Sequence, residues 1–215
     1  MFTRRLARRV ARRYRKHGLS PTAQRIVGFL VDHGIEDASV LEIGGGIGEL
    51  QLELLRRGAA NVTNLEISTN YEVEAARLLH QSGIADRVSR RFLDIARAPD
   101  EVELADVVVL HRVVCCYPDH QALLSAAASH AKRLLVWSHP ADTAVTRVAF
   151  WTENFLRSLR GNNFRVYVHP PESMVAVAEC DGMSTSYRHR SRQWEVVGMV
   201  RRELTAGPVQ HPGIG

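Results

Sequence analysis

An apolar stretch that ends in an acid and runs straight into glycines most limits how this chain can fold. Residues 40–48 are Val-Leu-Glu-Ile-Gly-Gly-Gly-Ile-Gly. This pattern predicts a buried strand that turns into a helix through a loop able to approach a ligand closely, because glycine has no Cβ. A second apolar run, residues 61–66, also ends in an acid, 18 residues after Gly48. We expect it to be the next parallel strand, with Glu66 placed to accept hydrogen bonds from ribose hydroxyls.

The spacing of the glycines distinguishes two classes of nucleotide site. A dinucleotide fingerprint is Gly-x-Gly-x-x-Gly, and a match that begins at Gly44 would end on a glutamate. The chain instead has acid-x-Gly-x-Gly-x-Gly, beginning at Glu42. Together with Glu66, this spacing resembles motif I of the class I S-adenosylmethionine-dependent methyltransferases. The resemblance covers about residues 14–201.

The resemblance implies cofactor contacts at the ends of three successive strands. The acid before the glycines would contact the ammonium side of the methionine moiety, and the helix start after the loop favours its carboxylate. Phe92-Leu93-Asp94-Ile95 resembles the family's adenine-binding turn. There Asp94 would accept from the adenine amino group, and the Ile95 amide would donate to a ring nitrogen. The implied cofactor-binding residues are Glu42, Gly44, Gly46, Gly48, Glu66, Asp94, Ile95 and His111.

Two residues are candidates for catalysis. In the family, the residue that leaves the fourth strand lies beside the reactive sulfonium, and here that residue is His111. A histidine with a pKa of about 6.5 can remove a proton from an attacking oxygen or nitrogen, although a strand-end histidine can also serve only as a backbone hydrogen-bonding group. Tyr14 is the second candidate, because N-terminal residues of this family often close over the cofactor.

Cys115 and Cys116 are either packing residues or part of the acceptor pocket. His169 either faces that pocket or lies in a solvated turn.

Short apolar strands alternate with helical patterns, which predicts a parallel sheet with right-handed crossovers. Strands are expected at residues 39–43, 62–67, 88–93, 106–111, 133–138, 184–190 and 193–202. Helices are expected at residues 48–57, 72–82, 121–130, 143–159 and 171–180, the second with Val73, Ala76, Leu78 and Leu79 facing inward. The last two strands have a very tight connection and form a hairpin. We therefore predict an α/β, Rossmann-like fold with a seven-stranded, mostly parallel sheet, a C-terminal antiparallel hairpin and helices on both faces.

The positive charge is concentrated at the N-terminus. Of 28 basic residues, eight lie in residues 1–16 without any acid, which leaves 20 against 23 acids in the rest of the chain. Phe2, Leu6, Val10 and Tyr14 recur every four residues opposite the arginines, so the segment predicts a basic amphipathic helix. It could be a lid packed on the domain, a contact for anionic lipid, part of a targeting segment, or, least favoured because interleaved aromatic residues are absent, a nucleic-acid contact. The predicted domains are this helix at 1–20, a methyltransferase domain at 21–203 and a disordered tail at 204–215.

Composition bears on where the protein is located and on whether it binds a metal. No apolar run approaches the roughly 20 residues needed to span a bilayer, and no secretory signal is visible. Three cysteines without metal-ligand spacing favour a reducing compartment and predict no metal site. The predicted location is cytoplasmic, with possible attachment to an anionic membrane surface through residues 1–16.

Three segments, beginning at Tyr117-Pro118, Phe164 and Trp194, are similar to the magnesium-protoporphyrin O-methyltransferase branch. That branch has a histidine where this chain has Cys116, so only its architecture is carried over. The predicted function is S-adenosylmethionine-dependent methyl transfer to an oxygen or nitrogen of a small, amphipathic or lipid-like acceptor. The alternative is a non-catalytic adaptor, binding membrane or nucleic acid, that retains the fold.

Overall fold

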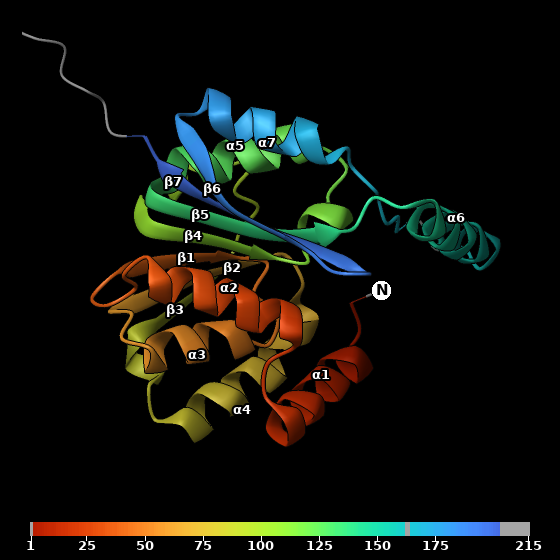
Figure 1. Cartoon of the computed structure of the whole chain (residues 1–215). Coiled ribbons are helices and arrows are strands. Elements are labelled where there is room, and N and C mark those ends of the chain that lie inside the picture. The colour runs from red at the N-terminus through yellow and green to blue at the C-terminus, as the bar shows by residue number, and fades with distance from the viewer. Residues whose placement is uncertain (1, 162–163, 203–215) are drawn as a thin grey trace, which may run out of the picture.

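Seven strands form one sheet in the order β3-β2-β1-β4-β5-β7-β6 (Figure 1). In the computed structural model, which describes residues 2–161 and 164–202, the strands in this order are Val88–Phe92, Asn61–Glu66, Ser39–Ile43, Ala105–His111, Ala131–Pro140, Trp194–Arg201 and Met183–Arg190. Neighbours from β3 to β5 are parallel, whereas β7 runs antiparallel to both β5 and β6. The predicted fold is therefore confirmed. The predicted tail at 204–215 lies outside the described residues.

Helices cover both faces of the sheet. They are α1 (Arg4–His17), α2 (Pro21–Asp32), α3 (Glu49–Arg56), α4 (Glu72–Ser82), α5 (His120–His130), α6 (Ala144–Leu159) and α7 (Pro171–Cys180). Helices α5 and α7 lie on one face, and α2, α3 and α4 lie on the other, with α1 outside α4 (Figure 1). Helix α6 projects from the body beside the carboxyl ends of the parallel strands.

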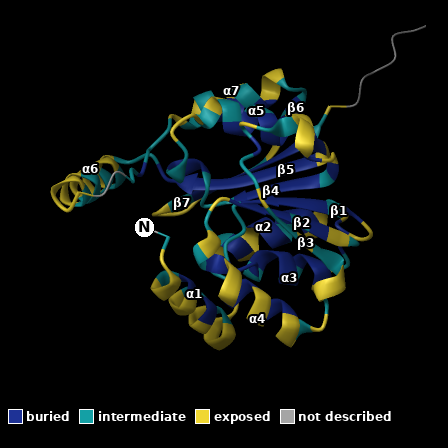
Figure 2. Ribbon diagram, turned by 180° about the vertical axis from the view of Figure 1, so that it is seen from behind, coloured by how far each residue is buried: buried dark blue, intermediate teal, exposed yellow. Residues whose placement is uncertain are grey.

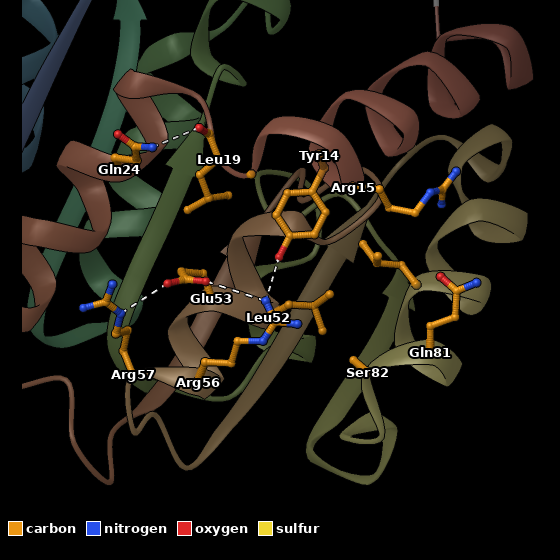
Figure 3. A pocket seen from close by; sticks show the side chains of 12 residues that line it. Tyr14, Arg15, Leu19, Gln24, Leu52, Glu53, Arg56, Arg57, Gln81 and Ser82 are labelled. Atoms are coloured by element: carbon orange, nitrogen blue, oxygen red, sulfur yellow. Dashed lines mark hydrogen bonds and ion pairs between the residues drawn. The ribbon is translucent and has the colours of Figure 1, made fainter.

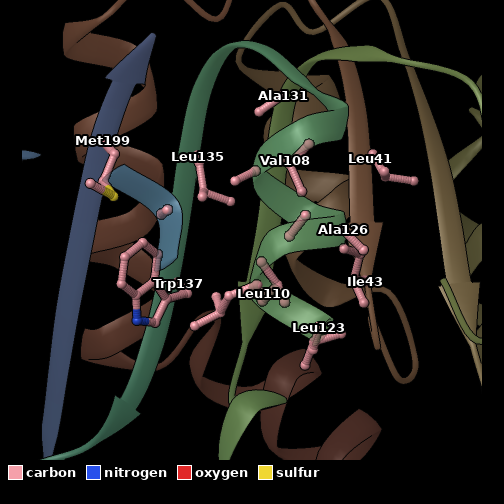
Figure 4. Packing of buried hydrophobic residues seen from close by; sticks show 14 of the residues in the cluster. Leu41, Ile43, Val108, Leu110, Leu123, Ala126, Ala131, Leu135, Trp137 and Met199 are labelled. Carbon is pink, nitrogen blue, oxygen red and sulfur yellow. The ribbon is translucent and has the colours of Figure 1, made fainter. Parts of the chain in front are cut away.

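Each face of the sheet has its own apolar core, as expected for parallel strands covered on both sides. On the α5–α7 face, Leu41, Leu110 and Trp137 pack against the helices and are at most 1% exposed (Figure 4). On the other face, Val40 and Val107 pack against α2 and α3. Figure 2 shows these strands as the buried centre of the molecule. The result is a rigid platform whose carboxyl edge carries the predicted site residues.

Strand order creates a crevice at that edge. β1 pairs with β2 on one side and β4 on the other, so the connections leave β1 in opposite directions. Ligands of open α/β sheets bind at such a switch point, outside the carboxyl ends of the strands. The glycine loop follows β1 directly at this position.

Helix α1 packs on the domain through its apolar side. Ala7 and Ala11 are fully buried in a cluster with Ile47 and Leu52, and Asn70 Nδ2 donates to the Phe2 carbonyl at 2.7 Å. Its arginines face outward, as the spacing predicts. Within the described residues, no helix has the length and apolarity needed to cross a membrane.

The predicted inner face of α4 is partly wrong. Leu78 and Leu79 are buried, but Val73 and Ala76 are exposed, and the buried positions in their place are Ala75 and Glu74. Burial of Glu74 depends on α1, because Arg8 contacts its carboxylate at 3.7 Å, in addition to Arg77 of α4 itself at 3.0 Å. Periodicity cannot anticipate a charged residue that is buried by a partner from another helix.

Candidate active site

The glycine loop rests on a buried polar network. Asn64 Nδ2 donates to Glu42 Oε2 at 3.0 Å and to Gln51 Oε1 at 2.9 Å, and all three residues are buried. A Cβ at Gly45 would collide with the Asn64 amide and lie 2.5 Å from Glu42 Oε2. A Cβ at Gly48 would collide with the Gln51 amide. Two of the loop's glycines are therefore required by the network beneath them.

The other two glycines shape the surface of the loop. Gly44 and Gly46 have φ values of 67° and 55°, and residues other than glycine seldom adopt this left-handed region. The Gly44 amide donates to the Leu65 carbonyl at 2.6 Å, which ties the loop to the end of β2. The first three glycines line a cavity of about 900 Å³, within the range of about 300–1,000 Å³ typical of ligand pockets. A Cβ at Gly46 would meet nothing closer than Tyr71 at 3.8 Å, so backbone borders open space there.

Glu66 lies at the end of β2 with its carboxylate held by backbone donors. Gly46 N donates to Oε2, and the Ile67 and Ser68 amides donate to Oε1, each at 2.9 Å. Burial raises the pKa of Glu66, and these three hydrogen bonds oppose that rise by favouring the charged form. The carboxylate is thus preoriented at the cavity wall, where the sequence predicts it.

Four acids line the cavity: Glu42, Glu49, Glu66 and Glu153, the last in an ion pair with Arg157. Burial, reinforced by the nearby Glu49, raises the pKa of Glu42 to about 8. The pKa of Glu49 is also raised, chiefly by burial. A raised pKa means that burial disfavours the charged form of these carboxyl groups. A cation beside them would favour that charged form. The arrangement therefore suits a positively charged ligand.

Three of the predicted cofactor residues do not line this cavity. Gly48 caps α3 in a left-handed conformation, and its amide donates to the Gly45 carbonyl at 2.8 Å. Ile95 is 1% exposed and belongs to the core. Asp94 accepts from the Tyr117 hydroxyl at 3.0 Å, and Tyr117 does line the cavity. The adenine-contact role of Asp94 and Ile95 stays a prediction.

His111, at the end of β4, lines the cavity in a constrained setting. Its Nδ1 lies 2.9 Å from Ser138 Oγ, which also accepts from the Arg112 amide at 3.0 Å. Burial and the adjacent Arg112 charge lower the pKa of His111 to about 3. This lies below the value of about 6.5 expected from the sequence, because the half-buried strand end reduces hydration of the imidazole. A neutral His111 is a weak base.

Tyr14 lines the same cavity, but its hydroxyl points elsewhere. Arg56 Nη1 donates to it at 3.1 Å, and Arg56 lines only a second cavity of about 600 Å³ between α1, α3 and α4 (Figure 3). Burial raises the pKa of the Tyr14 hydroxyl. The ring therefore contributes to the wall, and the predicted catalytic role remains a prediction without a polar contact at the cavity to support it.

Apolar and aromatic side chains from segments distant in sequence also line the cavity. Besides Val113, Cys115 and Cys116, they are Phe2, Leu6, Tyr71, Tyr117, Phe150, Phe164 and Trp194. The Arg112 guanidinium lies 4.6 Å from the centre of the Trp194 ring, and Arg112 itself has a φ of 60°. Strained non-glycine residues concentrate at ligand sites. The sequence pointed to the segments of Tyr117, Phe164 and Trp194 by resemblance, but it did not show that their side chains meet in one wall.

His169 is not part of the lining. Its Nε2 lies 3.0 Å from the Tyr117 carbonyl oxygen, and its ring stacks on His120 with centroids 4.3 Å apart. It therefore supports the segment that carries Tyr117 from behind. The alternative of a residue facing the pocket is wrong for His169.

Comparison with known proteins agrees with this geometry. A family model described as a methyltransferase domain matches residues 40–135. Magnesium protoporphyrin IX methyltransferase from Synechocystis PCC 6803, solved with bound S-adenosylhomocysteine, is 24% identical with a TM-score of 0.68, covering 84% of this chain and 82% of that one. A putative sarcosine dimethylglycine methyltransferase from Galdieria sulphuraria is 13% identical with a TM-score of 0.67, covering 83% and 84%. Among curated proteins, no sequence matches.

The match to the methyltransferase-domain model indicates an enzyme of the transferase type. The fold is that of class I S-adenosylmethionine-dependent methyltransferases. A second structure of the Synechocystis enzyme, 22% identical with a TM-score of 0.65, was solved with bound S-adenosylmethionine. An O-methyltransferase family protein from Burkholderia thailandensis has the same fold at 18% identity and a TM-score of 0.66, covering 84% of this chain and 56% of that one.

Proposed function

We propose that this methyltransferase transfers the methyl group of S-adenosylmethionine to an oxygen or nitrogen of a small, amphipathic acceptor with an apolar, planar body. The observation that carries the proposal is the mixed lining of one cavity, which combines glycines and acids with aromatic side chains. In the proposal, the glycines and acids form a polar end for the cofactor, and Phe150, Phe164 and Trp194 form an aromatic end for the acceptor. Apolar walls with a few fixed polar groups are typical of sites for small organic ligands.

The residues at the polar end fit the cofactor. The glycine loop offers backbone where a Cβ would intrude, and Glu66 presents a carboxylate whose position is fixed by three amides. In the proposal, Glu66 accepts hydrogen bonds from the ribose hydroxyls of the cofactor, and Glu42 and Glu49 offset the positive charge of the cofactor. The bound cofactor would supply an electrophilic methyl group, so the protein's task is alignment and exclusion of water.

At the aromatic end, His111 is proposed to orient the acceptor and not to act as a strong base. The tautomer with hydrogen on Nδ1 donates to Ser138 Oγ and leaves Nε2 as an acceptor for a hydroxyl or amine. A pKa of about 3 keeps the imidazole neutral at physiological pH. The acceptor's proton then leaves for solvent as the new bond forms, and we expect no rate dependence on a group titrating near pH 6.5.

Helix α1 is proposed to form one wall of the site. Phe2, Leu6, Val10 and Arg13 line the cavity, so the helix cannot be removed without opening it. Truncation before Tyr14 should therefore weaken cofactor binding. Contact of its arginines with anionic lipid, and a lipid-like acceptor, remain compatible with this arrangement because the arginines of α1 other than Arg13 face outward.

The direct test has two stages. Calorimetry should show binding of S-adenosylhomocysteine and none of NAD. Incubation with methyl-labelled cofactor and a panel of phenols, aromatic carboxylates, amines and porphyrins should then label one acceptor class, identified by mass spectrometry. Cofactor binding without labelling of the panel or of a cell extract would favour the adaptor alternative over methyl transfer.

A further inference from the structure

Helix α6 has its apolar side turned away from the protein. None of its 16 residues is buried. Val145, Val148, Trp151, Phe155, Leu156 and Leu159 are all exposed, with Trp151 at 68% and Leu159 at 69%. Trp151 and Phe155 stack with parallel rings 5.7 Å apart. A contiguous apolar surface of this kind on a monomer marks a binding site.

The orientation of α6 is fixed by its opposite side. Phe150 and Glu153 line the cavity, and Asn154 pairs with the backbone of Val166, accepting from its amide at 2.9 Å and donating to its carbonyl at 2.8 Å. Arg157 forms an ion pair with Glu153 on the same side. Residues 148, 151, 155 and 159 lie on the other side at helical spacing, so they face outward because the anchoring side is occupied.

Helix α1 supplies a cationic surface next to α6. The Phe2 ring packs edge-on against Phe164 at 5.3 Å, and the Arg157 guanidinium of α6 lies 5.4 Å from the same ring. The two helices also line one cavity and lie at the same end of the molecule in both views (Figures 1 and 2). The apolar side of α1 is docked on the domain, so its basic residues Arg4, Arg5, Arg8, Arg9, Arg12, Arg13, Arg15 and Lys16 are all exposed.

We propose that the outward side of α6 rests in the interface of a bilayer containing anionic lipid, with the α1 arginines against the headgroups. An apolar stripe with an exposed tryptophan and an adjacent arginine cluster supplies both terms of interfacial binding, apolar burial and attraction to anionic lipid. A second copy of the chain is a poorer occupant, because joining two α6 helices would bring two arginine clusters together. The proposal differs from simple attachment through residues 1–16, since it assigns the apolar contact to α6.

This placement has a consequence for the site. α6 contributes Phe150 to the aromatic end of the cavity, so docking would bring that end close to the lipid surface. If the proposed methyl transfer to an amphipathic acceptor is right, the acceptor could enter from the membrane. Docking itself does not depend on methyl transfer, and binding to vesicles can be measured without any acceptor.

The test is sedimentation of the full-length protein with vesicles of phosphatidylcholine, with and without phosphatidylglycerol. Wild type should bind the anionic vesicles at low salt and dissociate as salt rises. The variant Trp151→Ser, Phe155→Ser, Leu159→Ser should bind at least about tenfold more weakly. The matched control Val31→Ser, Val73→Ser, Leu104→Ser removes three exposed apolar side chains elsewhere and should bind as wild type does. Both variants should keep their affinity for S-adenosylhomocysteine, which verifies folding.

Three outcomes would overturn the proposal. Wild type could fail to bind anionic vesicles, the α6 variant could bind them as tightly as wild type, or the control variant could lose as much vesicle affinity as the α6 variant. A wild-type dimer in analytical ultracentrifugation that the α6 variant dissociates, without vesicle binding by either, would assign the surface to a second copy. In vesicle binding, Trp151 should also shift its fluorescence to shorter wavelength. Substitution of Arg4, Arg9 and Arg12 by Gln should reduce the salt dependence while retaining part of the binding.

Discussion

The two groups of residues that line the cavity, the proposed polar and aromatic ends, are built on different principles. The polar end consists of the loop after β1 and the end of β2, two segments held together by the sheet and by hydrogen bonds such as that from Gly46 N to Glu66. The aromatic end collects side chains from α1, α6 and β7, and from the segment after β4. The first is backbone held by the sheet, whereas the second is a set of side chains brought together from several elements. From this difference we expect that cofactor binding and acceptor choice can be altered independently.

The largest effect is expected at the polar end, from Glu66→Ala. Loss of a carboxylate that accepts from ribose hydroxyls should weaken cofactor binding by about 1.5–3 kcal/mol, since hydrogen bonds to charged groups contribute on that scale. Glu103→Ala, which removes an exposed acid, is the control and should leave calorimetric affinity unchanged. An unaltered dissociation constant for Glu66→Ala would remove Glu66 from the site.

Substitution of the loop glycines by alanine should distinguish the cost of steric collision from the cost of a strained backbone. Gly45→Ala places a methyl group against Asn64 and Glu42 and should reduce the free energy of unfolding by about 1–3 kcal/mol. Gly46→Ala meets only open space but keeps a positive φ, and should cost about 1 kcal/mol. Gly28→Ala, in α2 with no neighbour within 4 Å, should be neutral or stabilising. Denaturant unfolding measures all three, and equal losses at Gly45 and Gly46 would contradict the role of the buried network.

At the aromatic end, Trp194→Ala should raise the acceptor KM by roughly tenfold, the effect of losing apolar contact worth about 1.4 kcal/mol. The cofactor dissociation constant should change less than about twofold, because Trp194 is not part of the glycine loop or the acid set. Trp151→Ala, measured without vesicles, is the aromatic control outside the cavity. A parallel loss of cofactor affinity in Trp194→Ala would mean that the two ends are coupled.

The smallest effect concerns the pH dependence of stability through Glu42. Its pKa is raised from 4.5 to about 8, so the folded state holds a proton that the unfolded state releases. The contribution is complete below the unfolded pKa and is lost as pH rises through the folded pKa, at up to about 1.4 kcal/mol per pH unit. Wild type should therefore lose stability relative to Glu42→Gln as pH rises from about 6.5 to 7.5. Parallel stability curves for the two proteins would show that the carboxyl group titrates normally.

Much of the fold follows from local patterns. Strand β1 and helices α4 and α7 begin and end where the sequence predicts, and most other elements differ by one or two residues at their ends. Apolar periodicity and the glycine loop are enough for this, because each is a property of neighbours in the chain. The errors occur where a distant partner intervenes: Glu74 is buried by α1, and His111 loses its ordinary basicity at a covered strand end.

By itself, the sequence determined the sheet, the class of enzyme and the position of Glu42 and Glu66 beside the glycine loop, because these depend on residues close in the chain and on the geometry of parallel strands. Only the tertiary structure decided why Gly45 must be glycine, which aromatic side chains form the acceptor wall, and that α1 buries its apolar side while α6 exposes one. The physical reason is that collisions, desolvation and the covering of an apolar side depend on atoms brought together from distant parts of the chain.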